Sequence, residues 1–296
     1  MNRSNQTQAG EGDQTAVSRS DEKGSPEIPV ELRRLASPDD FARAVELQRV
    51  TWGDSFRDLV PAAMLKVTQK IGGVTAGAFD GRGELVGFVY GLSGFRDNQL
   101  IHWSHMLAVK PDLRDHGVGR RLKEFQREQL VAAGIDWIYW TVDPLVARNA
   151  HLNLNRLHVQ IRDYVPDMYG DTGSNLHAFG TDRFVVAWPV SGESAHANRR
   201  VRDGERAGLW ETAILNGLDE QTLETLFLPS ARPCTVRVEI PNKVEALGIA
   251  EAFAWRTATR RSFLTALRAG YEVSGFCCSG DGRCFYLMSV RADVLS

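Results

Sequence analysis

One stretch, residues 101–128, constrains the fold of this chain more than any other part of the sequence. It reads IHWSHMLAVKPDLRDHGVGRRLKEFQRE, and its mostly apolar first nine residues end shortly before Pro111, as is typical of a buried strand. The residues that follow share one helical face at Val118, Leu122, Phe125, Ala132 and Ala133, and Gly134 predicts the helix end. The stretch therefore predicts a strand, a glycine-bearing turn and a helix in succession.

The turn between this strand and this helix, residues 114–119, is suited to bind an anion. Gly117 and Gly119 allow backbone N–H groups to approach a ligand closely. The positive end of the following helix dipole points to the same place. Phosphate oxygens would also meet three guanidinium groups, those of Arg114, Arg120 and Arg121. An ordinary helix-capping turn is the competing interpretation of the two glycines alone.

The longer phrase is more specific than the glycines. Leu107-Ala108-Val109-x-Pro111-x-x-Arg114-x-x-Gly117-x-Gly119 resembles the acyl-CoA pyrophosphate loop of the GNAT acyltransferase superfamily. The resemblance covers about residues 30–190 and continues through Trp140-Thr141-x-Asp143-Pro144-Leu145 and Asn149-Ala150. WGDSF, HWSHMLAV, WTVDPL, DMYG and TDRF are similar to phrases of a long bacterial branch, and some similar GNAT enzymes acylate amino acids with succinyl-CoA.

The resemblance implies acetyl-CoA or succinyl-CoA as co-substrate, with no metal. It places the cofactor-binding residues at Leu107, Val109, Arg114, Asp115, His116, Gly117, Val118, Gly119, Arg120 and Asn149. For Asn149, a solvated helix face over residues 148–159 is the competing interpretation.

The expected fold is α/β (α+β), with a mixed, mostly antiparallel central sheet flanked by helices. Residues 74–79 and 85–90 read as a β-hairpin, and 93–98 as the turn into the central strand. Residues 135–142 read as a buried strand. The resemblance implies that this strand runs parallel to the central one and splays from it, opening a slot for the pantetheine arm.

Four segments are expected along the chain. Residues 1–29 are polar and read as a disordered tail. Residues 30–190 form the GNAT acyl-CoA-binding catalytic domain, and 191–204 form a linker. Residues 205–296 form a smaller C-terminal α/β unit, with strands at 236–240, 271–277 and 284–290 and a helix at 244–269.

Composition excludes several other classes of protein. A formal net charge of −2 argues against a general nucleic-acid binder. The four cysteines, Cys234, Cys277, Cys278 and Cys284, make no CxxC pair and are expected to be reduced thiols in the cytoplasm. No apolar run reaches the length of a membrane span, so no membrane partner is expected. A homodimer is left open.

Acyl transfer from a thioester to an amine needs a base for the amine, stabilisation of the oxyanion and a proton for the leaving thiolate. His105 is the leading base, because it lies on the central strand and histidine titrates near neutral pH. The phrase around it is similar to the corresponding strand of serotonin N-acetyltransferase, where histidines relay a proton through water. His102 is a second candidate, although in a regular strand without a bulge it would face the opposite side. Half-buried structural histidines are the competing interpretation.

The general acid is less clearly marked. Many GNAT enzymes carry a tyrosine in the helix after the fifth strand, where this chain has Asn155 and Arg156. Tyr164 and Tyr169 follow and are the candidate acids, with simple packing as the alternative. Arg183 is either part of a structural ion pair with Asp182 or a partner for a substrate carboxylate.

The sequence therefore predicts an acyl-CoA-dependent N-acyltransferase that moves an acetyl or succinyl group to the primary amine of a small molecule such as an amino acid. The alternative is a non-catalytic acyl-CoA-binding or regulatory module. The turn at residues 114–119 fits both, and His105 favours the enzyme.

Overall fold

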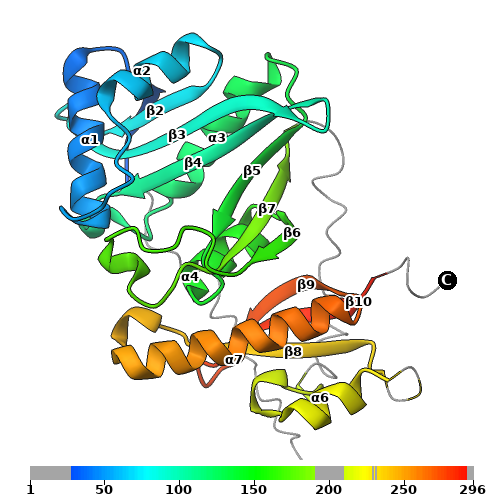
Figure 1. Cartoon of the computed structure of the whole chain (residues 1–296). Coiled ribbons are helices and arrows are strands. Elements are labelled where there is room, and N and C mark those ends of the chain that lie inside the picture. The colour runs from blue at the N-terminus through cyan, green and yellow to red at the C-terminus, as the bar shows by residue number, and fades with distance from the viewer. Residues whose placement is uncertain (1–27, 191–209, 229, 231, 292–296) are drawn as a thin grey trace, which may run out of the picture.

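The computed structural model describes residues 28–190, 210–228, 230 and 232–291. The predicted linker over 191–204, and all but the last two residues of the predicted tail over 1–29, lie outside the described residues. The described part contains a seven-stranded sheet and a three-stranded sheet with helices on both (Figure 1).

The large sheet confirms the predicted fold class. Its strands lie in the order β1-β2-β3-β4-β5-β7-β6, and every neighbouring pair is antiparallel except β4 and β5. Their bounds are Glu31–Arg34 (β1), Val74–Phe79 (β2), Leu85–Arg96 (β3), Gln99–Val109 (β4), Trp137–Val142 (β5), Gln160–Val165 (β6) and Arg183–Pro189 (β7).

Helices cover the two faces of this sheet separately (Figure 1). On one face lie α1 (Pro38–Trp52) and α2 (Ala62–Lys70), which share a core with Phe88, Tyr90 and Met106 of β3 and β4. On the other lies α3 (Val118–Val131), whose Val118, Leu122 and Leu130 are buried. The prediction that Ala132 and Ala133 belong to the apolar face of α3 is wrong, because the helix ends at Val131 and both alanines are exposed.

The start of α1 follows from its first residues. The Ser37 hydroxyl accepts from the backbone N–H of Asp40, and the Asp40 carboxylate accepts from the backbone N–H of Ser37. This reciprocal capping box, with Pro38 in the first turn, satisfies backbone donors that a helix start would otherwise leave unpaired. The run Ser37-Pro38-Asp39-Asp40 is typical of a helix start, and the helix begins there.

The hairpin between β3 and β4 is longer than predicted. The expected turn at 93–98 is mostly strand, because β3 continues to Arg96 and only Asp97 and Asn98 form the turn. Both residues have positive φ, 50° and 61°, which short polar side chains tolerate and a tight two-residue hairpin turn requires.

The central pair β4 and β5 is splayed. The two strands run parallel but pair only at His102↔Ile138 and Trp103↔Tyr139. Beyond these residues β5 pairs with β7, and β4 pairs with β3 alone. The edge of β4 that faces β5 is therefore open from Ser104 to Val109, as the GNAT resemblance implies.

A bulge interrupts β4 at the point where it leaves β5. Tyr90 of β3 pairs with Met106 and the next residue, Gly91, pairs with Ser104, so His105 is an extra residue in the ladder. A β-bulge turns the strand locally and re-aims side chains on either side of it. It determines which face of the sheet His105 reaches.

The second unit contains a three-stranded sheet in the order β8-β10-β9, with β8 at Thr235–Ile240, β9 at Tyr271–Cys278 and β10 at Cys284–Val290. Two helices belong to it, α6 (Glu220–Leu226) and α7 (Ile249–Arg268). The predicted helix over 244–269 begins later, because Val244–Ala246 is a separate 3₁₀ turn and Gly248 precedes α7.

This unit packs directly against the large sheet (Figure 1). Phe184 of β7 lies 4.9 Å from Phe263 of α7 and 5.4 Å from Tyr286 of β10, measured between ring centroids. Arg256 of α7 donates to both carboxylate oxygens of Asp143, which follows β5, at 2.9 and 2.8 Å. The aromatic core and the buried ion pair hold the two units together.

Two further expectations need correction. The predicted helix over 148–159 is a short α4 (Ala147–Ala150) followed by a π-helical turn, His151–Arg156, and His158 has a positive φ of 53°. Cys278 and Cys284 form a disulfide, because they are cross-strand neighbours on β9 and β10 with Cα atoms 4.1 Å apart. The prediction of four thiols is wrong for this pair, whereas Cys234 is a free thiol.

Candidate active site

The turn at residues 114–119 has the backbone of an anion-binding turn. Gly117 is the residue before α3 and has φ 77°, a left-handed conformation that glycine adopts at little cost. No side chain caps the start of α3 through Gly117, and its first turn contains no acidic residue. The positive end of the helix dipole is therefore not neutralised by a carboxylate in that turn.

Two arginines lie together beside this turn. Arg114 donates through Nε to the carbonyl of Val109 at 3.2 Å. Burial and then the nearby charge of Arg148 lower the pKa of Arg114, while Asp115 and Glu245 partly oppose the shift. Two guanidinium groups whose charges interact in this way favour an anion nearby.

The other predicted cofactor-binding residues are distributed unevenly around the turn. A β-carbon on Gly119 would lie 3.7 Å from Leu107 and 3.9 Å from Val109, so these two strand residues adjoin the start of α3. Asn149 follows Arg148 on α4, and its backbone carbonyl accepts a hydrogen bond from Asn153 Nδ2 at 2.7 Å. Asp115 has φ 66° and is exposed, and His116 and Val118 continue the turn into the helix.

Arg120 and Arg121 are less available than the sequence suggests. Arg120 forms an ion pair with Glu124 one turn further along α3, at 3.0 Å. Arg121 donates to the carbonyls of Ile28 and Val30, both at 2.9 Å, and thereby anchors the segment that precedes β1. Arg121 is thus a structural residue.

His105 lies at the bulge of β4, on the face covered by α1 and α2. Its ring meets the ring of Tyr90 edge-on, with centroids 6.0 Å apart, and its side chain is exposed. Burial of part of the ring lowers the pKa of His105, and the charge of Asp58 opposes this shift. The imidazole is therefore neutral over a wider pH range than in water, which suits a base.

His102 lies on the opposite face, so the bulge does not bring the two histidines together. It is fully buried, and its ring nitrogens lie 3.0 Å from Ser93 Oγ and 3.0 Å from Gln126 Nε2 of α3. Burial, followed by the charges of Lys123 and Arg34, lowers the pKa of His102 to about 3. These contacts give His102 a structural position, and it is not retained among the candidate catalytic residues.

Across the splay, Tyr169 lies beside β5. Its hydroxyl is 2.9 Å from the hydroxyl of Thr141, which points to the face opposite its buried neighbour Trp140. Tyr169 stacks on His177, with ring centroids 6.4 Å apart. Burial and then the charge of Arg183 lower the pKa of His177 to about 4, against the opposing charges of Asp143 and Asp58. The charge of Asp58 thus acts on both His105 and His177.

Residues 166–182, here called the acceptor loop, are fastened to the connection between α1 and α2. The backbone N–H of Arg57 donates to the Thr172 carbonyl at 2.9 Å, Ser55 Oγ to the Gly173 carbonyl at 2.6 Å, and Ser174 Oγ to the Trp52 carbonyl at 2.7 Å. Phe56 adds an edge-on contact with His177. The loop that carries Tyr169 and His177 is therefore held over the face on which His105 lies.

Tyr164, the other predicted acid, lies elsewhere. It is buried against Phe184 and Phe263, and its hydroxyl donates to the carboxylate of Asp182. Burial and this hydrogen bond raise the pKa of Tyr164 far above its ordinary value. It belongs to the ion-pair network between the two units and is not retained as a candidate acid.

Arg183 belongs to the same network. It is buried, and its guanidinium donates to the Asp182 carbonyl at 2.8 Å and lies 3.5 Å from the Asp143 carboxylate. Asp182 itself pairs with Arg260 of α7, so the expected pair between the Asp182 and Arg183 side chains does not form. The contacts favour the structural interpretation of Arg183.

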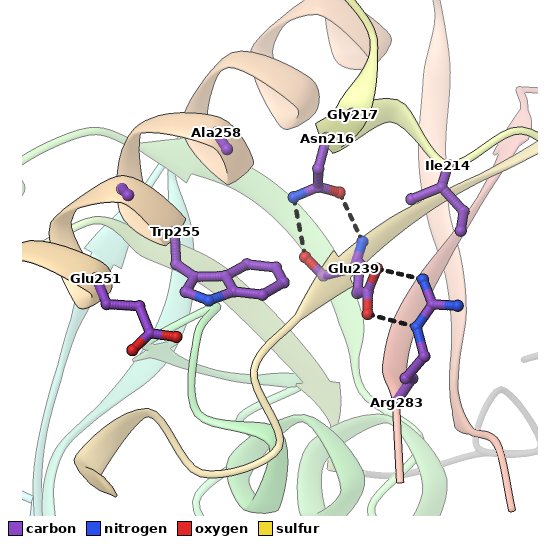
Figure 2. Close-up of a pocket in the computed structure, with 9 residues that line it drawn as sticks. Ile214, Asn216, Gly217, Glu239, Glu251, Trp255, Ala258 and Arg283 are labelled. Carbon is purple, nitrogen blue, oxygen red and sulfur yellow. Dashed lines mark hydrogen bonds and ion pairs between the residues drawn. The ribbon is translucent and has the colours of Figure 1, made fainter. Parts of the chain in front are cut away.

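A separate recess of about 490 Å³ lies in the second unit, between α7 and β8 (Figure 2). Its side chains include Trp255, and the Asn216 amide bonds both backbone groups of Glu239 (Figure 2). The lining contains none of the predicted site residues.

Sequence reasoning missed three members of the site, Asp58, Thr141 and His177. Each lies in a different segment, and no spacing or motif connects them. The splay and the fastened acceptor loop bring them together.

Within the described residues no helix is both long and apolar enough to cross a lipid bilayer. The same residues contain no group of three or more His, Cys, Asp or Glu side chains placed to hold a metal ion.

Comparisons with known proteins show likeness in structure only. No family model matches the sequence, and no curated protein sequence matches it. Solved structures with a similar fold include the ribosomal-protein-S18-alanine N-acetyltransferase from Escherichia coli, at 17% identity and a TM-score of 0.43, over 56% of this chain and 97% of that one. A phosphinothricin acetyltransferase from Sinorhizobium meliloti in complex with acetyl-CoA is 18% identical at a TM-score of 0.43, over 56% of this chain and 91% of that one. The NatC complex bound to Gag peptide and CoA is 16% identical at a TM-score of 0.44, over 55% of this chain and 100% of that one.

Sequence identities of 16–18% and TM-scores of 0.43–0.44 are too low to assign a function. The strand order and the splayed, parallel β4–β5 pair are the basis for the fold assignment. They confirm at the level of fold the resemblance to the GNAT superfamily.

Proposed function

We propose that this chain is an acyl-CoA-dependent N-acyltransferase, which moves an acetyl or succinyl group to the primary amine of a small molecule such as an amino acid. The single observation that carries the proposal is the open edge of β4. This edge runs from Val109, beside the anion-suited turn, to Ser104, beside the bulge that presents His105.

Acyl-CoA fits this arrangement in two respects. The turn at 114–119, with Arg114 and Arg148, suits the pyrophosphate. The pantetheine arm carries amide groups, which can hydrogen-bond to an open strand edge as a neighbouring strand would. With the pyrophosphate at the turn and the arm along β4, the thioester lies near the bulge. Leu107, Val109 and Asn149 are assigned to binding, together with the turn residues 114–120.

The chemistry requires a neutral amine next to the thioester carbonyl. His105 takes a proton from the substrate ammonium, directly or through one water molecule. The amine nitrogen then bonds to the carbonyl carbon, and backbone N–H groups at the bulge are suited to stabilise the oxyanion. The nitrogen gives up its extra proton to solvent, the tetrahedral intermediate collapses with cleavage of the C–S bond, the neutral amide remains on the acceptor, and CoA leaves as a thiolate.

Tyr169 is proposed as the acid that protonates this thiolate. Its hydroxyl bonds to Thr141 on β5, the strand across the open edge from His105. Thr141 fixes the hydroxyl position, and stacking on His177 fixes the ring. Asp58 and His177 then border the acceptor amine, where the carboxylate of Asp58 favours a cationic substrate.

The competing function is a non-catalytic acyl-CoA-binding or regulatory module. Thiol release measured with a thiol reagent, in the presence of acetyl-CoA or succinyl-CoA and a pool of free amino acids, separates the two. The enzyme gives steady thiol release that depends on the amino acids, with the acylated product detectable by mass spectrometry. Binding of CoA without amine-dependent thiol release from any amine in a broad panel would instead support the module.

A further inference from the structure

A lysine is buried beneath the splay of β4 and β5. Lys123 of α3 is 3% exposed. Its Nζ donates to Ser104 Oγ at 2.6 Å and lies 3.8 Å from the centre of the Trp140 ring. Among the described residues no carboxylate forms an ion pair with it, since neither a hydrogen bond nor a salt bridge joins Lys123 to an acid. Lysine is almost never fully buried unless it is paired.

The absence of an acidic partner has an electrostatic consequence. Removal of a charged ammonium from water is costly, and one hydroxyl and one aromatic face compensate it only in part. Burial lowers the pKa of Lys123 well below its ordinary value. The side chain is thus poised to become an ammonium when a carboxylate arrives beside it.

The position of Lys123 connects it to the acyl group. Ser104 is the first residue of β4 beyond the last pair with β5, Trp103↔Tyr139, and Trp140 is its counterpart on β5. Val109, beside the CoA turn, is five residues away from Ser104, or about 17 Å along an extended strand. Lys123 therefore lies at the narrow end of the splay, where the acyl end of the arm lies in the proposed function.

The polar groups around Lys123 are incompletely satisfied. Gln126, nearly one turn further along α3, bonds to His102 through Nε2, but its Oε1 is buried and has no hydrogen-bond partner among the described residues. A buried polar atom without a partner is rare and calls for an explanation such as a missing polar ligand or water. Lys123, Gln126, His102 and Ser104 form what we call the apex cluster.

We propose that Lys123 determines the choice of acyl group by binding the terminal carboxylate of a CoA monothioester of a dicarboxylic acid. This inference rests on the proposed function, because it requires the acyl end of the co-substrate to lie at the apex cluster. The carboxylate supplies the missing counter-ion, and the ammonium donates a charge-assisted hydrogen bond to it. An acyl chain of the same length that ends in a methyl group leaves Lys123 unpaired.

Binding of such an acyl group takes up a proton. His102, the other titratable side chain of the apex cluster, stays neutral because burial is the largest effect that lowers its pKa to about 3. Lys123 is therefore the group of the cluster whose protonation a bound carboxylate favours. The carboxylate arrives ionised, so proton uptake distinguishes it from a neutral acyl chain.

The test compares CoA, butyryl-CoA and succinyl-CoA by isothermal titration calorimetry with the wild-type chain and Lys123→Met. Butyryl and succinyl groups have the same number of carbons, so they differ in charge rather than in length. We expect the wild type to bind succinyl-CoA at least tenfold more tightly than butyryl-CoA, the scale of one charge-assisted hydrogen bond. Lys123→Met should lose or reverse this preference and keep its affinity for CoA.

Repeating the titrations near neutral pH in buffers of different ionisation enthalpy measures proton uptake. The wild type should take up as much as about one proton with succinyl-CoA and fewer with butyryl-CoA, and Lys123→Met should show no difference between them. Methionine is apolar and similarly long, so the melting temperature checks that the variant folds. Equal wild-type affinities for the two acyl-CoAs, or a preference that survives in Lys123→Met, would overturn the Lys123 assignment alone. Failure of CoA itself to bind would overturn the proposed function as well.

Discussion

A single methyl group at Gly173 tests whether the acceptor loop is held in place as the contacts indicate. Gly173 has φ 70°, and a β-carbon there would lie 2.3 Å from the backbone oxygen of Ser55. This separation is far below any ordinary contact. Neither the β-carbon nor the backbone oxygen can rotate away from the other. The Gly173→Ala variant must therefore move the acceptor loop away from the connection between α1 and α2.

Gly170, in the same loop, provides the matched control. It has φ 59°, but a β-carbon there would meet nothing within 4 Å. Both alanine variants pay for a left-handed conformation, about 1–2 kcal/mol each. Gly173→Ala also loses two hydrogen bonds, from Arg57 N–H to the Thr172 carbonyl and from Ser55 Oγ to the Gly173 carbonyl, which contribute about 1 kcal/mol each. We expect Gly170→Ala to destabilise by about 1–2 kcal/mol and Gly173→Ala by about 3–4 kcal/mol.

Urea denaturation with linear extrapolation measures both free energies of unfolding. The transfer assay adds a functional measurement, since displacement of His177 and Tyr169 should raise the KM for the acceptor amine while the affinity for CoA is kept. Equal destabilisation by the two variants, with equal acceptor KM, would refute the view that these contacts hold the loop.

Three further changes test the site and the joint between the units. His105→Ala should lower kcat roughly 100-fold at neutral pH. The loss should shrink at high pH, where more of the amine is already deprotonated. Because burial lowers the pKa of His105, the acidic limb of the wild-type pH–rate profile should lie below the ordinary histidine pKa, and this limb should be absent in the variant. Normal turnover by His105→Ala near pH 7 would move the base elsewhere. Tyr169→Phe removes only the hydroxyl and should lower kcat with little change in CoA affinity, and an unaltered kcat would exclude Tyr169 as the acid. Arg256→Met breaks the buried pair with Asp143 and should destabilise by about 3 kcal/mol. Arg283→Met, which breaks the exposed pair with Glu239, should destabilise far less. Similar losses in denaturation would contradict this account of the joint.

The sequence was most informative where one residue type is required by one backbone geometry. Ser37-Pro38 predicts the start of α1, and the glycine turn predicts the start of α3, because caps and left-handed residues are local properties. The parallel, splayed β4–β5 pair is also as the resemblance implied. The two helix starts depend little on the rest of the chain, whereas the splayed strand pair is non-local and was expected only from the resemblance.

The features that were missed depend on tertiary contacts. Lys123 and Gln126 lie on a helix where polar residues would be expected to face water, but the sheet above them makes them buried. Tyr164 and Tyr169 look alike in the sequence, and only the acceptor loop and the second unit separate their environments. The disulfide depends on the register of β9 and β10, which spacing alone does not reveal.

The most direct test of the central claim is the affinity of CoA for the wild type, Gly119→Asn and Gly119→Asp, measured by isothermal titration calorimetry. A β-carbon at Gly119 has room and its φ is not positive, so both variants should fold and differ from each other only in charge. A carboxylate there would repel the pyrophosphate at the turn. We predict that the wild type binds CoA, that Gly119→Asn binds it more weakly, and that Gly119→Asp binds it far more weakly than Gly119→Asn. A wild type that does not bind CoA, or a folded Gly119→Asp variant that binds it as the wild type does, would contradict the assignment of this turn.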